Sequence, residues 1–235
     1  MYEAAHARPD GESTVARLAT TAAESGYDGL VVRNHGDALA EYDRATIAES
    51  YDIDIVDGVE VRADDPSRAS GFLGNHRDHR TLVAVHGGTV RMNRFAVEQP
   101  AVDVLAHPLT DDGDVNHVIA KTAAENGVHI EWSLRDVLRS DGGRRVEAIR
   151  GLRKLRQLIQ QYDAPYVVSA DATTHLQMRA PRELAALGEV LDCPPAWIET
   201  GLKAWGNIAE RNRTRTGDRF VEPGVRLGRD DESER

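Results

Sequence analysis

Short runs of apolar and mostly β-branched residues recur along the chain at fairly even intervals. Between most of these runs, apolar residues return at helical spacing, as in residues 15–23 and 118–123. Short apolar runs that alternate with helical segments are typical of repeated βα units. The predicted strands lie within seven such runs, which are residues 2–6, 28–34, 55–61, 81–86, 103–107, 128–132 and 166–170.

The connections between the runs indicate how these strands pair. A helical crossover returns the chain parallel to the preceding strand, so the pattern predicts one parallel sheet. Seven βα units favour a sheet that closes on itself, which predicts an α/β fold of the TIM-like barrel type with about seven parallel strands. Gly26 and Gly127 support this phasing, because each follows a predicted helix where a left-handed C-terminal residue is needed.

Two parts of the chain depart from the βα pattern. Residues 62–80 are polar and poorly periodic, and we interpret them as a long loop with at most a short helix. After the last strand, residues 182–191 and 196–212 have the periodicity of helices that close the barrel. We therefore expect one barrel domain over residues 1–227, closing helices included, and a disordered charged tail over 228–235.

Composition narrows the compartment in which the protein works. No apolar segment reaches the roughly 18 residues that span a bilayer, and the polar first residues do not form a signal peptide. Cys193 is the only cysteine among 235 residues, which excludes an intrachain disulfide and a zinc site made of several thiolates. These features predict a cytoplasmic protein with no membrane association.

The chain is acidic, with a formal net charge of -10, and lysine occurs only at Lys121, Lys154 and Lys203. Such a charge ordinarily argues against nucleic-acid binding, since phosphate contacts need lysine and arginine. Here, however, acidic residues are spread along the whole chain, as expected for a protein of a salt-loving host. A GC-rich coding bias that favours arginine over lysine is an equally good explanation.

Histidines and carboxylates gather at the ends of the predicted strands. In an α/β barrel the carboxyl ends of the strands share one face, where functional groups lie. On this rule the face holds His6, His35, His86, His107, His175, Glu60, Glu131 and Asp171. Imidazole and carboxylate are the ligands of zinc, manganese and iron, which activate water against phosphate esters. The alternative for each histidine is a hydrogen-bonded turn residue, and we assign to loops or the surface His76, His79, His117 and His129.

Four segments resemble, in order and spacing, the motifs of the polymerase and histidinol phosphatase (PHP) barrels. They are Asn34-His35, Gly58-Val59-Glu60, Ala106-His107-Pro108 and Ser169-Ala170-Asp171-Ala172. The resemblance implies a metal-dependent phosphoesterase, but the chain departs from the family pattern in three places. Ala4 stands where that pattern has a histidine, Asn34 where it has an aspartate, and Asp171 and His175 are farther apart than the pattern allows.

These departures argue against a working multi-metal centre, because a metal cluster tolerates little error in ligand number or geometry. The residues that still match the PHP pattern are His6, His35, Glu60, His107 and Asp171. This reduced set leaves room for at most a single, weakly bound ion. We therefore predict no cofactor for this chain and interpret the five residues as the remnant of a metal site.

Within the PHP superfamily, the chain resembles more closely the p30 subunit (protein component 3) family of archaeal ribonuclease P. The matching segments are residues 24–32, 58–61, 103–108 and 210–212. This resemblance implies a subunit of the ribonucleoprotein that removes the 5′ leader from precursor tRNA. It also implies that the ribonuclease P RNA, with Mg²⁺, is the catalyst, and that this protein supports the RNA together with another protein subunit. The alternative is a metal-dependent PHP-type phosphoesterase with a rearranged ligand set.

A protein that supports RNA needs a basic surface, and three segments offer one. The candidates for RNA binding are Arg150, Arg153 and Lys154 on a helix predicted over 144–162, Arg179 and Arg182 near the last strand, and Arg211 and Arg213 in the closing helices. The alternative for the first three is an ordinary solvated helix face. Trp197 and Trp205 are either core residues or an exposed anchor for a protein partner.

Overall fold

The computed structural model describes residues 1–216, 220–222 and 225–226. Seven strands form one sheet, in which each strand pairs in parallel with the next along the chain. The strands are β1 (Tyr2–Ala5), β2 (Gly29–Val32), β3 (Asp54–Val61), β4 (Leu82–His86), β5 (Val104–Ala106), β6 (His129–Ser133) and β7 (Tyr166–Ser169). The predicted TIM-like α/β barrel is therefore confirmed.

The barrel is nearly closed, because the first and last strands meet at one point. Ala5 and Ala172 form an isolated parallel bridge there. The backbone N–H of His6 donates to the carbonyl of Ala172 at 3.0 Å. This contact places the end of β1 beside the end of β7, so polar residues that follow the two strands become neighbours.

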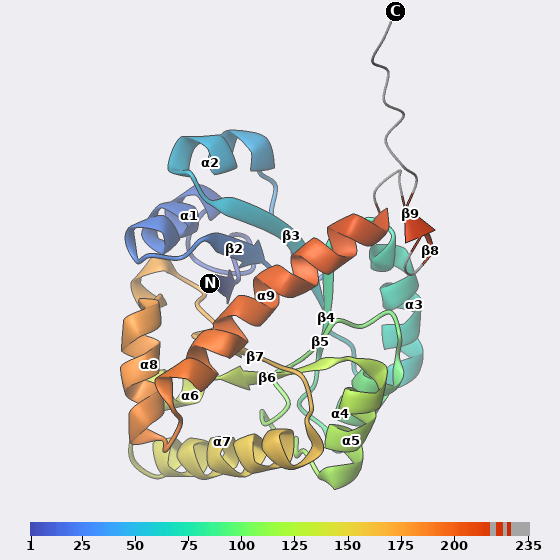
Figure 1. Ribbon diagram of the computed structural model, residues 1–235, viewed down its shortest axis with the longest axis vertical. Helices are drawn as coiled ribbons and strands as arrows, with labels where there is room; N and C mark the ends of the chain where they lie inside the picture. The colour runs from blue at the N-terminus through green and yellow to red at the C-terminus, as the bar shows by residue number, and fades with distance from the viewer. Residues whose placement is uncertain (217–219, 223–224, 227–235) are drawn as a thin grey trace, which may run out of the picture.

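Helices surround the sheet and connect its strands (Figure 1). They are α1 (Val15–Glu24), α2 (Arg44–Tyr51), α3 (Pro66–Arg77), α4 (Val90–Glu98), α5 (His117–Asn126), α6 (Arg135–Arg139), α7 (Gly142–Tyr162), the 3-10 turn η1 (His175–Gln177), α8 (Pro181–Val190) and α9 (Pro195–Thr216). A small antiparallel pair, β8 (Phe220–Glu222) and β9 (Val225–Arg226), follows α9. None of the helices in the described residues is long and apolar enough to cross a membrane.

Helix α9 covers the end of the barrel at which the strands begin. In Figure 1 it runs diagonally from the neighbourhood of α8 to that of β8. The side-chain amide of Asn212 donates to the carbonyl of Thr81, just before β4, at 2.9 Å, and Arg213 pairs with Asp54 at the start of β3. With this end covered, the opposite end, where the strands finish, is the one left for a site.

The period of two along each strand divides the apolar residues between two cores. The outward residues pack under the surrounding helices. The inward residues fill the barrel and meet α9, and they are Ala4, Val31, Val56, Leu82, Ala84, Val104, Ala106 and Val167, with Trp205, Ile208 and Ala209 from α9. Trp205 is fully buried, and its indole N–H donates to the carbonyl of Val168 at 2.9 Å. Trp205 is therefore a core residue, whereas Trp197 is half-buried and stacks on Tyr166.

The loop predicted over residues 62–80 was wrong, because α3 occupies most of it. Asp65 caps the helix by accepting hydrogen bonds from the backbone N–H groups of Ser67 and Arg68, and Pro66 is its first residue. The helix buries only Ala69 and Leu73. An apolar stripe this narrow leaves almost no helical periodicity in the sequence, so the cap and the proline were the usable signals.

The two closing helices were predicted correctly and correspond to α8 and α9. The assignment of His129 to a loop or the surface was wrong, since it lies in β6, where burial and the nearby Arg211 lower its pKa to about 4. His76 lies in α3. The tail predicted over 228–235 falls outside the described residues.

Candidate functional site

Four histidines gather at the mouth of the barrel, where the strands end. The rings of His6 and His35 stack with their centroids 5.0 Å apart, and those of His86 and His107 lie 4.7 Å apart. His35 and His86 join the two pairs at 5.6 Å. These residues follow or end β1, β2, β4 and β5, so the barrel brings together side chains that are remote in the sequence.

His175, the fifth histidine predicted on this face, makes different contacts. It lies in η1, and its Nδ1 is 2.9 Å from the hydroxyl of Ser13. The backbone N–H of His175 donates to the same hydroxyl at 3.0 Å. His175 thus ties the loop after β7 to the loop after β1, and the other four histidines form the cluster.

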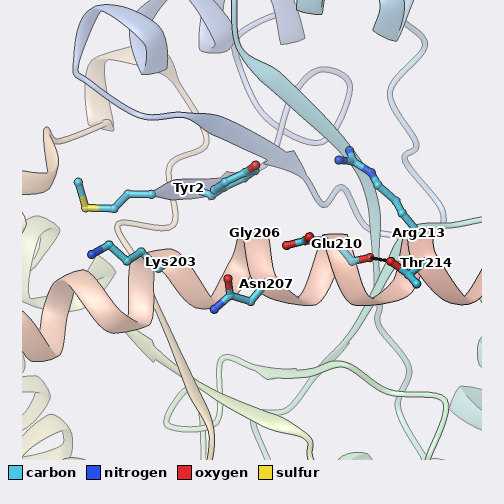
Figure 2. Close-up of a pocket in the computed structure, with 8 residues that line it drawn as sticks. Tyr2, Lys203, Gly206, Asn207, Glu210, Arg213 and Thr214 are labelled. Carbon is cyan, nitrogen blue, oxygen red and sulfur yellow. Dashed lines mark hydrogen bonds between the residues drawn. The ribbon is translucent and has the colours of Figure 1, made fainter. Parts of the chain in front are cut away.

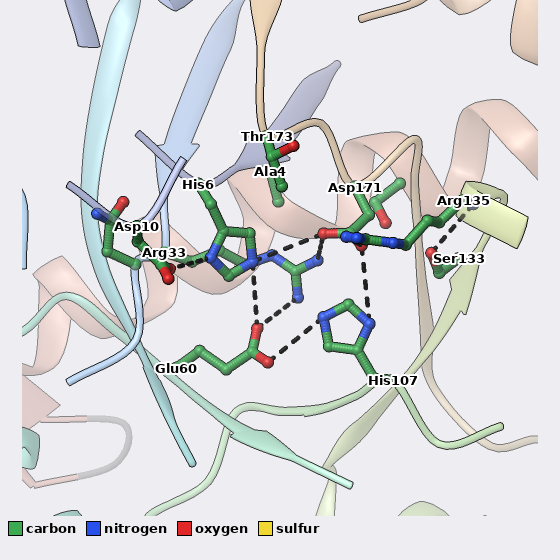
Figure 3. Close-up of polar contacts among 12 residues, drawn as sticks. Ala4, His6, Asp10, Arg33, Glu60, His107, Ser133, Arg135, Asp171 and Thr173 are labelled. Carbon is green, nitrogen blue, oxygen red and sulfur yellow. Dashed lines mark hydrogen bonds and ion pairs between the residues drawn. The ribbon is translucent and has the colours of Figure 1, made fainter. Parts of the chain in front are cut away.

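Arg33 occupies the centre of the cluster, where no cation was predicted (Figure 3). Its Nη1 donates to Glu60 at 3.1 Å, and its Nη2 donates to Glu131 at 2.7 Å and to Asp171 at 2.9 Å. All four side chains are fully buried. Burial by itself lowers the pKa of Arg33, but the charges of Glu131, Glu60 and Asp171 raise it above its usual value.

Asp10 is a second member of the cluster that the sequence did not indicate. Its carboxylate is 2.7 Å from Nδ1 of His6 and 2.9 Å from Nδ1 of His35, and it accepts the backbone N–H of His35. Burial opposes the ionisation of Asp10, but the hydrogen bonds from His35 and His6 hold its pKa well below the usual range. The loop after β1 therefore covers these two histidines, and its Asp10 carboxylate pairs with both of their rings.

Protonated side chains offset part of the negative charge of the cluster. Despite burial, the hydrogen-bonded carboxylate of Asp10 and the nearby carboxylate of Glu60 raise the pKa of His35 to about 9. The charges of Glu60 and Asp171 likewise raise the pKa of His107 to about 9 against the effect of burial. Both imidazoles are therefore cations at neutral pH, and they add to the positive charge of Arg33 among the buried carboxylates.

The position of Arg33 follows from the period of two in β2. Val31 points into the barrel, so Arg33 and His35 have the same register at the end of that strand. An arginine in register with an inward valine, directly after a fully buried strand, was the signal that could have found it. For Asp10 the spacing of four residues after His6 was too weak a signal.

The predicted RNA-binding residues of α7 are exposed and paired with acids of the same chain. Arg150 contacts Glu147, Arg153 contacts Asp192 and Lys154 contacts Asp114, at 3.0, 2.8 and 2.8 Å. The apolar face of α7 buries Leu152, Leu155 and Ile159. The helix is therefore amphipathic, as predicted, and presents these three cations to solvent.

The other candidates lie at two separate places. Arg179 donates to the carbonyls of Leu176 and Met178, and Arg182 is exposed on the first turn of α8. Arg211 contacts Asp103 at 2.7 Å, and Arg213 contacts Asp54 at 2.8 Å, both at the end of the barrel covered by α9. The structure thus distributes the candidates over different faces of the molecule.

A groove of about 640 Å³ lies between β1 and α9, away from the histidine cluster. Figure 2 shows Tyr2 above α9, with Lys203, Asn207 and Glu210 along the helix. Its lining carries both signs of charge, so it does not select an anion or a cation.

A comparison with protein families places the chain in one of them. The family model for the RNase P subunit p30 matches residues 1–217. The chain belongs to the RNase P subunit p30 family. This membership supports the ribonuclease P interpretation over the phosphoesterase alternative.

Relatives in the RNase P subunit p30 family are similar over nearly the whole chain. Ribonuclease P protein component 3 of Haloarcula marismortui is 60% identical over 227 residues, which cover 97% of this chain and 97% of the relative. The component of Natronomonas pharaonis is 59% identical over 98% of this chain and 97% of the relative, and that of Methanosarcina barkeri is 35% identical over 94% and 92%.

Two solved structures share the barrel fold. A chain in the cryo-EM structure of archaeal ribonuclease P with mature tRNA superposes with a TM-score of 0.82 at 22% identity, covering 99% of this chain and 100% of that one. Histidinol phosphate phosphatase from Lactococcus lactis, solved with zinc, L-histidinol and phosphate, gives a TM-score of 0.54 at 11% identity, covering 90% and 93%. The fold of this chain is thus that of the PHP phosphatases.

The residues of this chain do not fit the metal cluster that the PHP fold implies. Ala4 offers no ligand atom. The Asn34 amide is engaged by the backbone, since it donates to the carbonyls of Ala7 and Ala38 at 2.7 and 2.8 Å and accepts the N–H of Ala7 at 2.8 Å. At two positions where the phosphatase pattern has ligands, this chain therefore has a buried core residue, Ala4, and a residue that hydrogen-bonds to loop backbone, Asn34.

Proposed function

We propose that this chain is a protein subunit of ribonuclease P and supports the catalytic RNA in removing the 5′ leader from precursor tRNA. The observation that carries the proposal is the match of the p30 family over residues 1–217. Its partners are then the ribonuclease P RNA and other protein subunits, with precursor tRNA as the substrate of the assembly. The Mg²⁺ of the reaction belongs to the RNA.

On this proposal the chain alone has no catalytic activity. The polar groups at the barrel mouth support this, because Arg33 holds Glu60, Glu131 and Asp171 together in a buried network. Carboxylates that are held in such a network are not available to bind ions that activate water. We also place the protein in the cytoplasm, where a chain with a single cysteine needs no disulfide.

RNA binding is assigned to the exposed cations, with α7 as the principal surface. Arg150, Arg153 and Lys154 lie on one helix face with side chains 70, 46 and 55% exposed. Ion pairs this exposed contribute little to stability, so the cations are able to exchange their carboxylate partners for phosphates at small cost. The assignment extends to Arg182 in α8 and to Arg213 in α9, which are exposed, and to Arg179 just before α8 and Arg211 in α9, which are partly exposed.

Reconstitution tests the proposal. The cognate ribonuclease P RNA is assembled with the other protein subunits, with and without this chain, and release of the 5′ leader from precursor tRNA is measured at fixed Mg²⁺. We expect omission of the chain to reduce the cleavage rate strongly. A cleavage rate unaffected by the chain would contradict the subunit role, and hydrolysis of precursor tRNA or of a simple phosphate ester by the chain alone would contradict a non-catalytic role.

A further inference from the structure

Four carboxylates converge at the barrel mouth with almost no access to water. Glu60, Glu131 and Asp171 are fully buried, and the side chain of Asp10 is 12% exposed. Buried carboxylates are very unfavourable unless cations and hydrogen-bond donors surround them. The identity of the compensating cation therefore decides what kind of site this cluster is.

Among the residues that the structure describes, three sets of side chains place ligand atoms within 4.8 Å of one another, close enough to hold a metal ion. They are His6, Asp10 and His35, then His6, His107 and Asp171, and finally His35, Glu60 and His86. Two of the sets depend on Asp171 or Glu60, which are partners of Arg33. In the remaining set Asp10 already bridges the two histidines.

Each oxygen of the four carboxylates already meets a donor from the chain. Glu60 contacts Arg33 through one oxygen and Nδ1 of His86 through the other, at 3.1 and 2.6 Å. Asp171 contacts Arg33 through Oδ1 and Arg135 through Oδ2, at 2.9 and 3.0 Å.

The two remaining carboxylates are equally engaged. Glu131 accepts hydrogen bonds from Arg33, from the hydroxyl of Ser169 at 2.6 Å and from the backbone N–H of His107 at 3.0 Å. Both oxygens of Asp10 contact the ring of His35. A metal ion therefore has to displace existing donors to enter.

Besides its three carboxylate partners, the guanidinium of Arg33 contacts an aromatic ring inside the barrel. Its central carbon lies 5.5 Å from the ring centroid of Trp205, which reaches into the barrel from α9. A planar cation with a fixed fork of donors suits three carboxylates that arrive from different strands. Glu60 comes from β3, Glu131 from β6 and Asp171 from just after β7.

We propose that the Arg33 guanidinium is the resident cation of the barrel mouth and takes the place that metal ions hold in catalytic barrels of this fold. The histidine and carboxylate cluster is then a structural plug that needs no ion. This assignment goes beyond the ribonuclease P role and stands or falls independently of it. On this assignment the cluster, despite its many metal-type side chains, holds no ion that could activate water.

The experiment compares the wild-type chain with Arg33→Met and with Arg135→Met as the matched control. Arg135 also contacts Asp171, but its side chain is 42% exposed. Each protein is stripped with a chelator and dialysed against Zn²⁺ or Mn²⁺. Bound metal is then measured by elemental analysis, and the thermal unfolding midpoint is measured with and without the ion.

We expect wild type and Arg135→Met to bind no stoichiometric ion and to unfold at the same temperature with or without metal. Arg33→Met leaves buried carboxylates without their cation, so its midpoint falls by on the order of 10 °C. Added metal then restores much of that loss and binds at about one ion per chain. A second variant, Arg33→Met with Glu131→Gln, removes one carboxylate charge and is expected to fold more readily and still bind metal.

Three results would overturn the proposal. The first is a wild-type chain that takes up a stoichiometric ion which His6→Ala abolishes. The second is a folded Arg33→Met protein that binds no more metal than Arg135→Met, and the double variant takes its place in this comparison if the single one does not fold even with metal. If neither Arg33 variant folds with metal, the proposal fails too, since metal is then no substitute for the guanidinium.

Discussion

The side chain of Glu3 lies between β1 and β7, the two strands of the barrel that do not pair along their length. Strands β1 and β7 meet only at the bridge between Ala5 and Ala172 among the residues that the structure describes. Beside it, the carboxyl group of Glu3 accepts the backbone N–H of Ala170 at 3.0 Å and the hydroxyl of Tyr27 at 3.1 Å. Burial raises the pKa of Glu3 to about 7, although these hydrogen bonds oppose the shift.

This shift predicts how stability depends on pH. Because the folded pKa of Glu3 lies above its unfolded value, the folded chain holds a proton that the unfolded chain releases between pH 4.5 and about 7. The free energy of unfolding therefore falls as the pH rises through this window. In Glu3→Gln this contribution disappears. From pH 4.5 to about 7, the free energy of unfolding of the variant should therefore rise by on the order of 3 kcal/mol relative to that of wild type.

Urea unfolding of wild type and Glu3→Gln across this pH range, at constant salt, checks the prediction. Glu24→Gln on the exposed side of α1 is the control, and its curve is expected to run parallel to that of wild type. Curves for wild type and Glu3→Gln that keep the same spacing at every pH would mean that Glu3 does not exchange a proton on folding.

At the scale of elements, α7 combines a core function with an exposed basic face. Leu152, Leu155 and Ile159 anchor it to the barrel. The acids that pair with its cations come from three places, namely the helix itself, the segment before α5 and the turn between α8 and α9. Since each pair is exposed, we expect removal of the three cations to change RNA binding more than folding.

The matched test replaces equal numbers of paired, exposed cations on two surfaces. One variant carries Arg150→Ala, Arg153→Ala and Lys154→Ala. The control carries Arg68→Ala, Arg94→Ala and Lys121→Ala, whose residues are about 67% exposed and pair with acids one turn away. We expect the α7 variant to bind the ribonuclease P RNA more weakly and to lower the slope of log K against log salt by about 2 to 3.

Binding is measured by RNA titration over a series of salt concentrations with the partner subunits present. The control variant should keep the wild-type slope. In both variants the free energy of unfolding should differ from that of wild type by no more than about 1 kcal/mol for each ion pair removed. Equal slopes for the two variants would remove α7 from the RNA surface and leave Arg179 and Arg182 as the next candidates.

At the scale of the whole molecule, we expect the acidic charge to make the stability of the protein depend on the salt concentration. The chain has a net charge of -10, and its relatives from Haloarcula marismortui and Natronomonas pharaonis are about 60% identical. Self-repulsion among surface carboxylates destabilises the folded state, and dissolved salt screens it, since the Debye length shrinks to about 3 Å at 1 M.

We therefore predict that KCl raises the unfolding midpoint. Between about 0.1 M and about 1 M the midpoint should rise by several degrees, where about 1 kcal/mol corresponds to roughly 2–4 °C for a chain of this size. A neutral osmolyte at matched osmolality separates screening from water activity. A midpoint indifferent to KCl would favour the coding-bias explanation of the scarce lysine.

The sequence by itself determined the barrel, its seven strands, the histidine-bearing face and the family, because these depend on local patterns. Apolar runs, their spacing and short motifs survive in a linear reading. It failed for α3, whose buried stripe has only two residues, Ala69 and Leu73.

Only the tertiary structure decided which charges are buried together. Arg33 reaches Glu60, Glu131 and Asp171, which lie 27, 98 and 138 residues away. Glu60 comes from the neighbouring strand β3, but Glu131 and Asp171 come from β6 and from just after β7 and reach Arg33 only because the sheet curls into a barrel. The packing of α9 over the other end of the barrel likewise pairs Arg211 with Asp103, 108 residues before it. A local pattern assigns a side chain to the interior of a strand, but the balance of charge there depends on all the strands at once.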